Sequence, residues 1–185
     1  MSEVFSIQLS NHTTQPDGKT GVWLDLPATA EQVQAAMGQI GVTQDNPWDY
    51  FISGFSSPEG RHLAIPYDLA LASGVNELNF LAARLEKLDA YEIGTLNAAL
   101  QQKNTELRTI SRIIDYPDNL DYFVNLPDIH TVAALGDYYL NRSGMVDMPD
   151  EWKPAIDRLA LGKHIAGLEQ GAFTEYGYIV KSGDQ

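Results

Sequence analysis

The sequence contains no cysteine, which excludes disulfide bonds, thiolate catalysis and zinc sites built on cysteine. Histidine is also scarce, and none of the four histidines has a second histidine at the spacing of a metal-binding pair. We therefore expect no metal and no cofactor. The chain lacks a basic start followed by a long apolar run, and no later apolar stretch reaches membrane-spanning length. We expect a soluble, cytoplasmic protein that binds no membrane.

Positively charged residues are also scarce. The 185 residues include 12 lysines and arginines against 25 aspartates and glutamates, for a formal net charge of −13. A negative charge of this size opposes binding to nucleic acid and favours basic partners. Residues 1–83 and residues 113–157 each hold nine acids against two bases, whereas residues 84–112 hold four against five. The sequence therefore predicts two acidic segments separated by a near-neutral one.

The densest acidic stretch, residues 115–157, does not have the composition of a disordered acidic tail. Its acids alternate with hydrophobic residues such as Phe123, Leu126 and Trp152, which are able to build a core. A folded element therefore holds the carboxylates at fixed positions. Fixed, closely spaced negative charge is a feature of the DNA backbone, which carries one charge per roughly 1.7 Å of duplex axis. We predict a DNA-mimic acidic surface made by Asp25, Glu31, Asp45, Asp49, Asp115, Asp118, Asp121, Asp128, Asp137, Asp147, Asp150, Glu151 and Asp157.

The apolar pattern predicts an α+β fold in three small domains with small antiparallel sheets. Alternating apolar residues predict strands over 5–9, 22–26 and 50–55. Thr29 with Gln32 forms a capping box that begins a helix, and Gly41 ends that helix. These elements make an N-terminal α+β domain over residues 1–65.

The rest of the chain is expected to form two further domains packed in a row, which favours an elongated molecule. Leucines at helical spacing over 78–88, a capping signal from Asp89 and Glu92, and a third helix around 107–113 predict a helical domain over residues 66–113. Residues 114–185 are expected to form an α+β domain. It comprises a strand over 122–126, a helix over 129–141, a helical region over 150–168 and a final strand over 173–180 with Gly177 as a bulge.

Familiar motifs for catalysis and metal binding do not fit. Gly18-Lys19-Thr20 ends like a phosphate loop, but Thr13 stands where that motif needs a glycine. Pro117 occupies the third position of a calcium loop that would begin at Asp115. Carboxylate pairs of a hydrolase leave no spacing signature, so a carboxylate-based hydrolase is an alternative. A merely soluble acidic domain is another.

Four pieces of the sequence, in collinear order, resemble a known family. They are GVWLDLPAT at residues 21–29, NELNFLAARLEKLDAYEIGTLNAAL at 76–100, LGDYY at 135–139 running on to Met148-Pro149, and a C-terminal pattern of Ile156-Asp157, Gly162-Lys163 and Gly177-Tyr178-Ile179. Together they resemble the ArdA antirestriction proteins of plasmids, conjugative transposons and phages. The stretch beginning LGDYY is similar to the part of that family called the antirestriction motif.

The resemblance implies a protein that is not an enzyme and has an acidic surface that imitates bent B-form DNA. It would occupy the DNA groove of a type I restriction-modification enzyme, on the methyltransferase core, and would not itself bind nucleic acid. The resemblance also implies a homodimer, with a contact through Leu135, Gly136, Tyr138, Tyr139 and Leu140. A mimic aimed at another nucleic-acid enzyme, such as a CRISPR effector, is the alternative within the same class.

Overall fold

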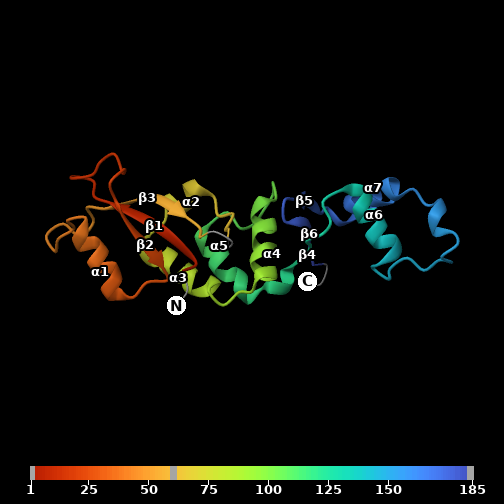
Figure 1. Cartoon of the computed structure of the whole chain (residues 1–185), viewed down its shortest axis with the longest axis horizontal. Coiled ribbons are helices and arrows are strands. Elements are labelled where there is room, and N and C mark those ends of the chain that lie inside the picture. The colour runs from red at the N-terminus through yellow and green to blue at the C-terminus, as the bar shows by residue number, and fades with distance from the viewer. Residues whose placement is uncertain (1–2, 59–61, 183–185) are drawn as a thin grey trace. The chain divides into compact units, whose positions relative to one another are not determined.

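The structure is a computed structural model that describes residues 3–58 and 62–182 (Figure 1). The chain forms two compact units: unit 1 comprises residues 1–93 and 106–118, and unit 2 comprises residues 94–105 and 119–185. The division falls inside helix α4 (Ala90–Gln101). Each unit combines helices with a three-stranded antiparallel sheet, so the α+β class is confirmed. The division into three domains stays a prediction.

Unit 1 contains the strands β1 (Phe5–Ser10), β2 (Val22–Leu26) and β3 (Phe51–Ser56), in the order β2-β1-β3. All three strands occur where apolar alternation predicts them. Phe5, Ile7 and Leu9 are fully buried on one face of β1. Because successive strand residues point to opposite faces, the second face of this sheet carries polar residues, among them Ser6 and Gln8.

Capping residues mark the ends of helices in unit 1. Helix α1 (Ala30–Gln39) has the predicted capping box, in which Gln32 N donates to Thr29 Oγ1 and Thr29 N donates to Gln32 Oε1. It ends before Gly41, whose φ of 82° is the left-handed conformation that glycine adopts without strain. Asp89 and Glu92 make the same reciprocal pair of hydrogen bonds at the start of α4.

The core of unit 1 lies between its sheet and helix α3 (Val75–Leu85), which buries Leu78, Leu81 and Leu85 completely. Helix α5 (Ile110–Asp115) packs against α3, and the short helix α2 (Tyr67–Leu71) packs against β3. The Asn79 side chain accepts from Ala28 N at 2.7 Å and donates to Ala28 O at 2.9 Å. This pair of bonds satisfies backbone groups of the segment between β2 and α1 and attaches it to α3.

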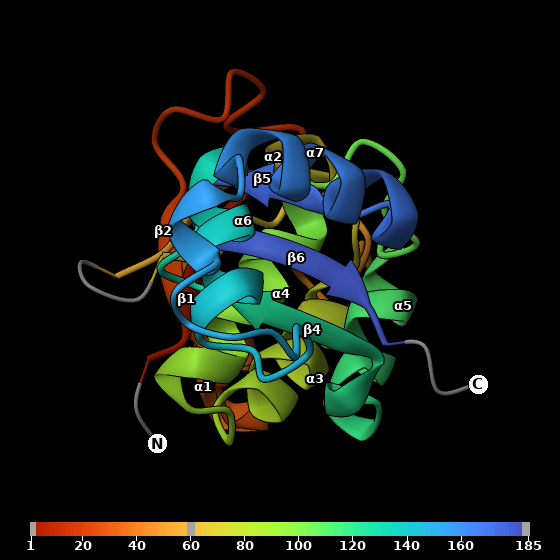
Figure 2. The same cartoon turned by 90° about the vertical axis from the view of Figure 1, so that its right-hand side faces the viewer.

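Unit 2 contains β4 (Phe123–Leu126), β5 (Ala172–Thr174) and β6 (Gly177–Lys181), together with the helices α6 (Val132–Asn141) and α7 (Arg158–Glu169). Figure 2 shows β6 between β5 and β4. The centre of its core is formed by Ile129, Leu135, Ile165 and Tyr178. Helices α6 and α7 pack closely on each other. No described helix of either unit has both the length and the apolar character needed to cross a membrane.

Two predictions about unit 2 are wrong in detail. The helical region predicted over 150–168 is interrupted by extended backbone at Ile156, and α7 begins only after Asp157, which caps it by accepting from Leu159 N and Ala160 N. The single strand predicted over 173–180 is a hairpin of β5 and β6, in which Thr174 pairs with Gly177. Gly177 begins β6 with a φ of 117° and is not a bulge within a continuous strand.

Candidate functional site

The acidic side chains of the described residues reach the surface. No acid is buried among residues 3–58 and 62–182, and the predicted DNA-mimic residues are exposed except Asp49 and Asp137, which are partly buried. The structure does not place the 115–157 stretch in a single element, because Asp115 and Asp118 belong to unit 1 and Asp121 to Asp157 belong to unit 2. The acids of this stretch are therefore held by two different scaffolds.

Three of the predicted acids are paired with bases of their own unit. Asp118 lies 2.6 Å from the Arg84 guanidinium, Asp137 lies 2.8 Å from Arg158 Nε, and Asp150 lies 2.8 Å from Lys153 Nζ. In each case the hydrogen bond from the base is the main reason why the pKa of the aspartate is held below its ordinary value. These carboxylates are partly compensated and are weaker attractors of an outside cation than an unpaired acid.

Other predicted acids have local structural roles. Asp157 caps α7, as described above, and Asp25 Oδ1 accepts from Ser6 Oγ at 2.9 Å. Glu31 lies in the first turn of α1, where a backbone hydrogen bond and the Thr29 hydroxyl lower its pKa. A carboxylate at this position also interacts favourably with the helix dipole.

A third group of acids is free to meet a partner. The structure shows no hydrogen bond or ion pair from any described residue to six of the predicted carboxylates, which are Asp45, Asp49, Asp121, Asp128, Asp147 and Glu151. Five of them lie in loops or turns, and Asp121 lies in a short 3₁₀ helix over Leu120–Tyr122. A carboxylate that no neighbouring base contacts is available to a base of a partner, so these six residues are the strongest candidates for binding.

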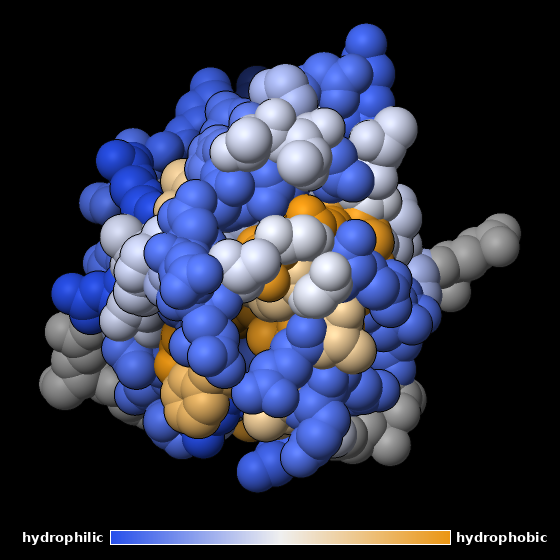
Figure 3. Space-filling view, turned by 90° about the vertical axis from the view of Figure 1, so that its left-hand side faces the viewer, coloured by the Kyte–Doolittle hydropathy of each residue, from blue (hydrophilic) through white to orange (hydrophobic). Residues whose placement is uncertain are grey.

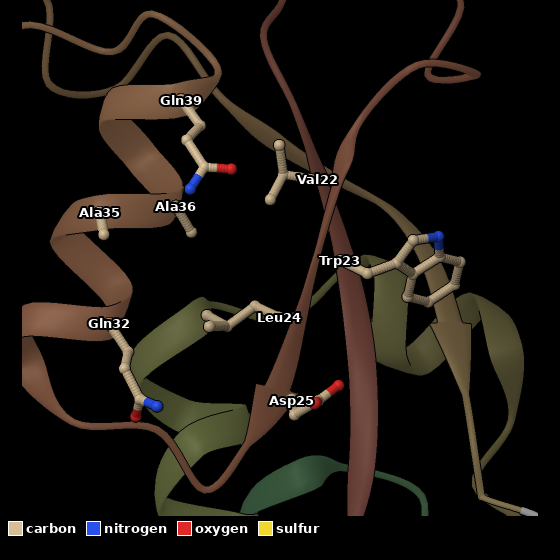
Figure 4. A pocket seen from close by; sticks show the side chains of 8 residues that line it. All are labelled: Val22, Trp23, Leu24, Asp25, Gln32, Ala35, Ala36 and Gln39. Carbon is tan, nitrogen blue, oxygen red and sulfur yellow. The ribbon is translucent and has the colours of Figure 1, made fainter.

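A groove lies between β2 and α1 and has a volume of about 300 Å³. Figure 4 shows Val22, Leu24, Gln32 and Gln39 around it, while the Trp23 and Asp25 side chains point to the other side of β2. The groove therefore has no pair of facing carboxylates, which a carboxylate-based hydrolase requires. No group of three or more metal-ligating side chains occurs among the described residues either. The groove does not support the hydrolase alternative.

The segment predicted to make a dimer contact is largely part of the core of unit 2. Leu135 and Leu140 are buried, and Gly136 lies against α7. A Cβ atom on Gly136 would lie 1.9 Å from Arg158 O, and one on Gly162 would lie 1.9 Å from Val132 O. The two glycines thus allow the α6 and α7 backbones to touch. Only Tyr138 and Tyr139 of the predicted residues keep partly exposed surface, and the dimer contact stays a prediction.

Two tyrosines share one carboxylate in the same core. Tyr139 Oη donates to Glu169 Oε1, and Tyr178 Oη donates to Glu169 Oε2 at 2.9 Å. Burial, reinforced by the bond to Glu169, raises the pKa of both phenols above the ordinary tyrosine value. Sequence reasoning assigned no role to Glu169, since the three residues are brought together only by the fold.

Within residues 3–58 and 62–182, the predicted carboxylates are spread over two small α+β units and lie at the surface. The family described as antirestriction protein (ArdA) matches residues 18–180, most of the chain. The chain belongs to this family of antirestriction proteins. A search of curated proteins finds no match.

Proposed function

We propose that this protein blocks type I restriction-modification enzymes by occupying their DNA groove with an acidic surface that imitates DNA. The observation that carries the proposal is the set of six carboxylates, five exposed and Asp49 partly buried, that have no partner among the described residues, which are Asp45, Asp49, Asp121, Asp128, Asp147 and Glu151. A groove that binds DNA is lined by lysine and arginine and attracts fixed negative charge of any source. The face of unit 1 drawn in Figure 3 is hydrophilic around a hydrophobic patch near its centre, so polar side chains surround an apolar area there.

Inhibition by this route needs no catalysis. The protein has only to compete with DNA for the groove, and both fast association and slow dissociation favour it. A net charge of −13 favours electrostatically steered association with a basic surface. Acids that are fixed on folded units lose little freedom on binding, whereas those of a disordered acidic chain would have to be ordered first.

The first test is the salt dependence of binding to the methyltransferase core of a type I enzyme. We expect affinity to fall by at least about tenfold between about 50 and 200 mM salt, because ions screen charge–charge attraction and compete for the basic groove. Isothermal titration calorimetry at several salt concentrations measures how affinity depends on salt. Displacement of a labelled DNA duplex from the same enzyme shows whether the two ligands compete. An affinity that does not change with salt would contradict charge mimicry.

The second test neutralises the candidate acids. We expect replacement of all six free carboxylates by Asn or Gln to weaken binding by about a hundredfold or more, while each single change costs about threefold or less, because many weak charge contacts add together. Binding and circular dichroism are measured on each variant.

A matched pair of double variants separates position from total charge. Asp121→Asn with Asp128→Asn changes two of the free predicted acids of unit 2. Asp68→Asn with Glu77→Gln changes two exposed acids outside the predicted surface by the same net charge. We expect the first pair to weaken binding several-fold more than the second. Equal losses would mean that only the total charge matters and that no defined surface is used.

A further inference from the structure

The second face of the unit 1 sheet carries a tryptophan platform, formed by Gln8, Trp23 and Gly54. These residues are neighbours across the sheet, since Gln8 pairs with Trp23 on β2 and with Gly54 on β3. A Cβ atom on Gly54 would lie 3.0 Å from Trp23 Cη2, so the indole reaches across β1 to the place that a side chain on β3 would fill. The Trp23 side chain nevertheless stays 49% exposed. A large aromatic side chain thus extends across the sheet and is half open to solvent.

The glutamine of the platform is hydrogen-bonded on both sides of β1. Gln8, which lies beside the indole, donates from Nε2 to Gly21 O at 3.4 Å and accepts at Oε1 from Ser53 Oγ at 3.3 Å. Both bonds join Gln8 to residues at or beside the neighbouring strands. A side chain that is already fixed loses little conformational freedom on binding, so its contacts contribute more to affinity.

Negative charge lies beside the platform. Asp25 follows Trp23 by two residues on β2 and points to the same side of the strand (Figure 4). Ser6 Oγ lies 2.9 Å from Asp25 Oδ1 and 2.7 Å from Glu3 Oε1. A hydroxyl has one proton and donates it to one carboxylate at a time. The other carboxylate is left to accept a hydrogen bond from outside.

We propose that this face binds an arginine side chain of a basic partner, with the guanidinium stacked on the Trp23 indole and hydrogen-bonded to Asp25 and Glu3. This inference rests on the proposed function, since it names a point of contact for the same basic groove. Arginine fits better than lysine because its planar group stacks on an aromatic face and donates to two carboxylates in one plane. A single-stranded nucleic acid would also stack on tryptophan, but the net charge of −13 and the adjacent carboxylates repel its phosphates.

Trp23 then contributes to binding in a different way from the six free acids. Charge contacts at the edge of an interface contribute little individually, whereas tryptophan and arginine are enriched among the few residues that dominate affinity. We expect Trp23→Ala to weaken binding to the methyltransferase core by about tenfold or more, and Trp23→Phe to weaken it less. The loss is expected to persist at high salt, where the contribution of the exposed acids is screened.

The control is Trp48→Ala, because Trp48 belongs to the same unit and is 80% exposed. We expect this variant to bind within about twofold of the unchanged protein. Asp25→Asn replaces one carboxylate oxygen of an exposed residue by an amide nitrogen. It is expected to weaken binding several-fold and tests the face without removing the indole. Circular dichroism and thermal unfolding establish that each variant is folded. If the unchanged protein does not bind the enzyme, the proposed function fails. If it binds, and folded Trp23→Ala and Asp25→Asn bind equally well, this inference fails.

A second experiment needs no restriction enzyme. With Trp48→Phe and Trp152→Phe in the full chain, Trp23 is the only fluorescent indole. We expect tri-arginine peptide to change its emission at several-fold lower concentration than tri-lysine, and Asp25→Asn to weaken the arginine response. A response to an oligothymidylate or to an oligosaccharide with none to tri-arginine would overturn the assignment to arginine.

Discussion

Replacing Gly136 by alanine is expected to destabilise unit 2 by about 3 kcal/mol or more. The added Cβ would lie 1.9 Å from Arg158 O and 2.8 Å from Arg158 C, and both are backbone atoms that cannot rotate away. The α6 and α7 helices would have to separate along their whole contact. This separation would also loosen Leu135 and Ile165 in the core. Gly162→Ala is expected to have the same effect from the other helix, because its Cβ would meet Val132 O at 1.9 Å.

Gly167→Ala is the matched control for this prediction. Gly167 lies in α7, the same helix as Gly162, but a Cβ there has no atom within 4 Å. Alanine is the better helix former, so this change is expected to stabilise unit 2 slightly, by about 1 kcal/mol or less. Denaturant unfolding gives the free energies, and hydrogen exchange of the α6 and α7 amides assigns the loss to unit 2. A Gly136→Ala protein with unchanged protection of these amides would show that the close approach is not required.

Replacing Glu169 by alanine is the second change with a large expected effect, a loss of about 3 kcal/mol. The carboxylate is the acceptor for the hydroxyls of both Tyr139 and Tyr178, and the Tyr178 side chain is fully buried. Removing the acceptor leaves the buried Tyr178 hydroxyl without a partner, which costs about 1 to 3 kcal/mol, and the partly exposed Tyr139 hydroxyl adds a smaller loss. Glu169→Gln is expected to lose less, because the amide oxygen still accepts from one tyrosine. Denaturant unfolding of both variants measures the difference.

The pH dependence of stability provides an independent check on this cluster. The pKa of Tyr178 is raised in the folded protein, whereas in the unfolded chain tyrosine titrates near pH 10. Above about pH 10 the unfolded chain releases a proton that the folded unit keeps, so stability is full below that pH and falls as pH rises further. Tyr178→Phe is therefore expected to be less stable at neutral pH but to lose less stability between about pH 9 and 11. An alkaline loss as large as that of the unchanged protein would contradict the role of Tyr178.

The local features of the fold follow closely from neighbouring residues. The three strands of unit 1 and the capping boxes at Thr29 and Asp89 were predictable, because alternation and side-chain capping act over a few residues. The hairpin of β5 and β6 was not. Thr174 Oγ1 donates to Gly177 O at 2.9 Å and accepts from Tyr176 N at 3.1 Å, and this turn lacks the Asn-Gly or Asp-Gly pair that marks many two-residue hairpins.

The candidate site likewise has one feature that the sequence predicts and another that only the fold decides. Composition predicts that the acids are at the surface, since an unpaired charge is rarely buried. Composition does not tell which acids are compensated. Asp118 is paired with Arg84 and Asp137 with Arg158. In both pairs the two residues are far apart in the sequence, so no local pattern predicts the pairing. Asp128 and Asp121 carry the same chemistry and have no such partner among the described residues.

The sequence alone determined that this is an acidic, cysteine-free α+β protein, and its collinear motifs were sufficient to predict the ArdA family. Tertiary structure decided which parts of those motifs serve the core and which meet the solvent. In the segment that resembles the antirestriction motif, Gly136 permits contact with α7 and Tyr139 donates to Glu169, while in the N-terminal segment Trp23 is half exposed on a sheet. The physical reason is that net charge and local periodicity are properties of neighbouring residues, whereas burial, pairing and close approach depend on residues that only the fold brings together.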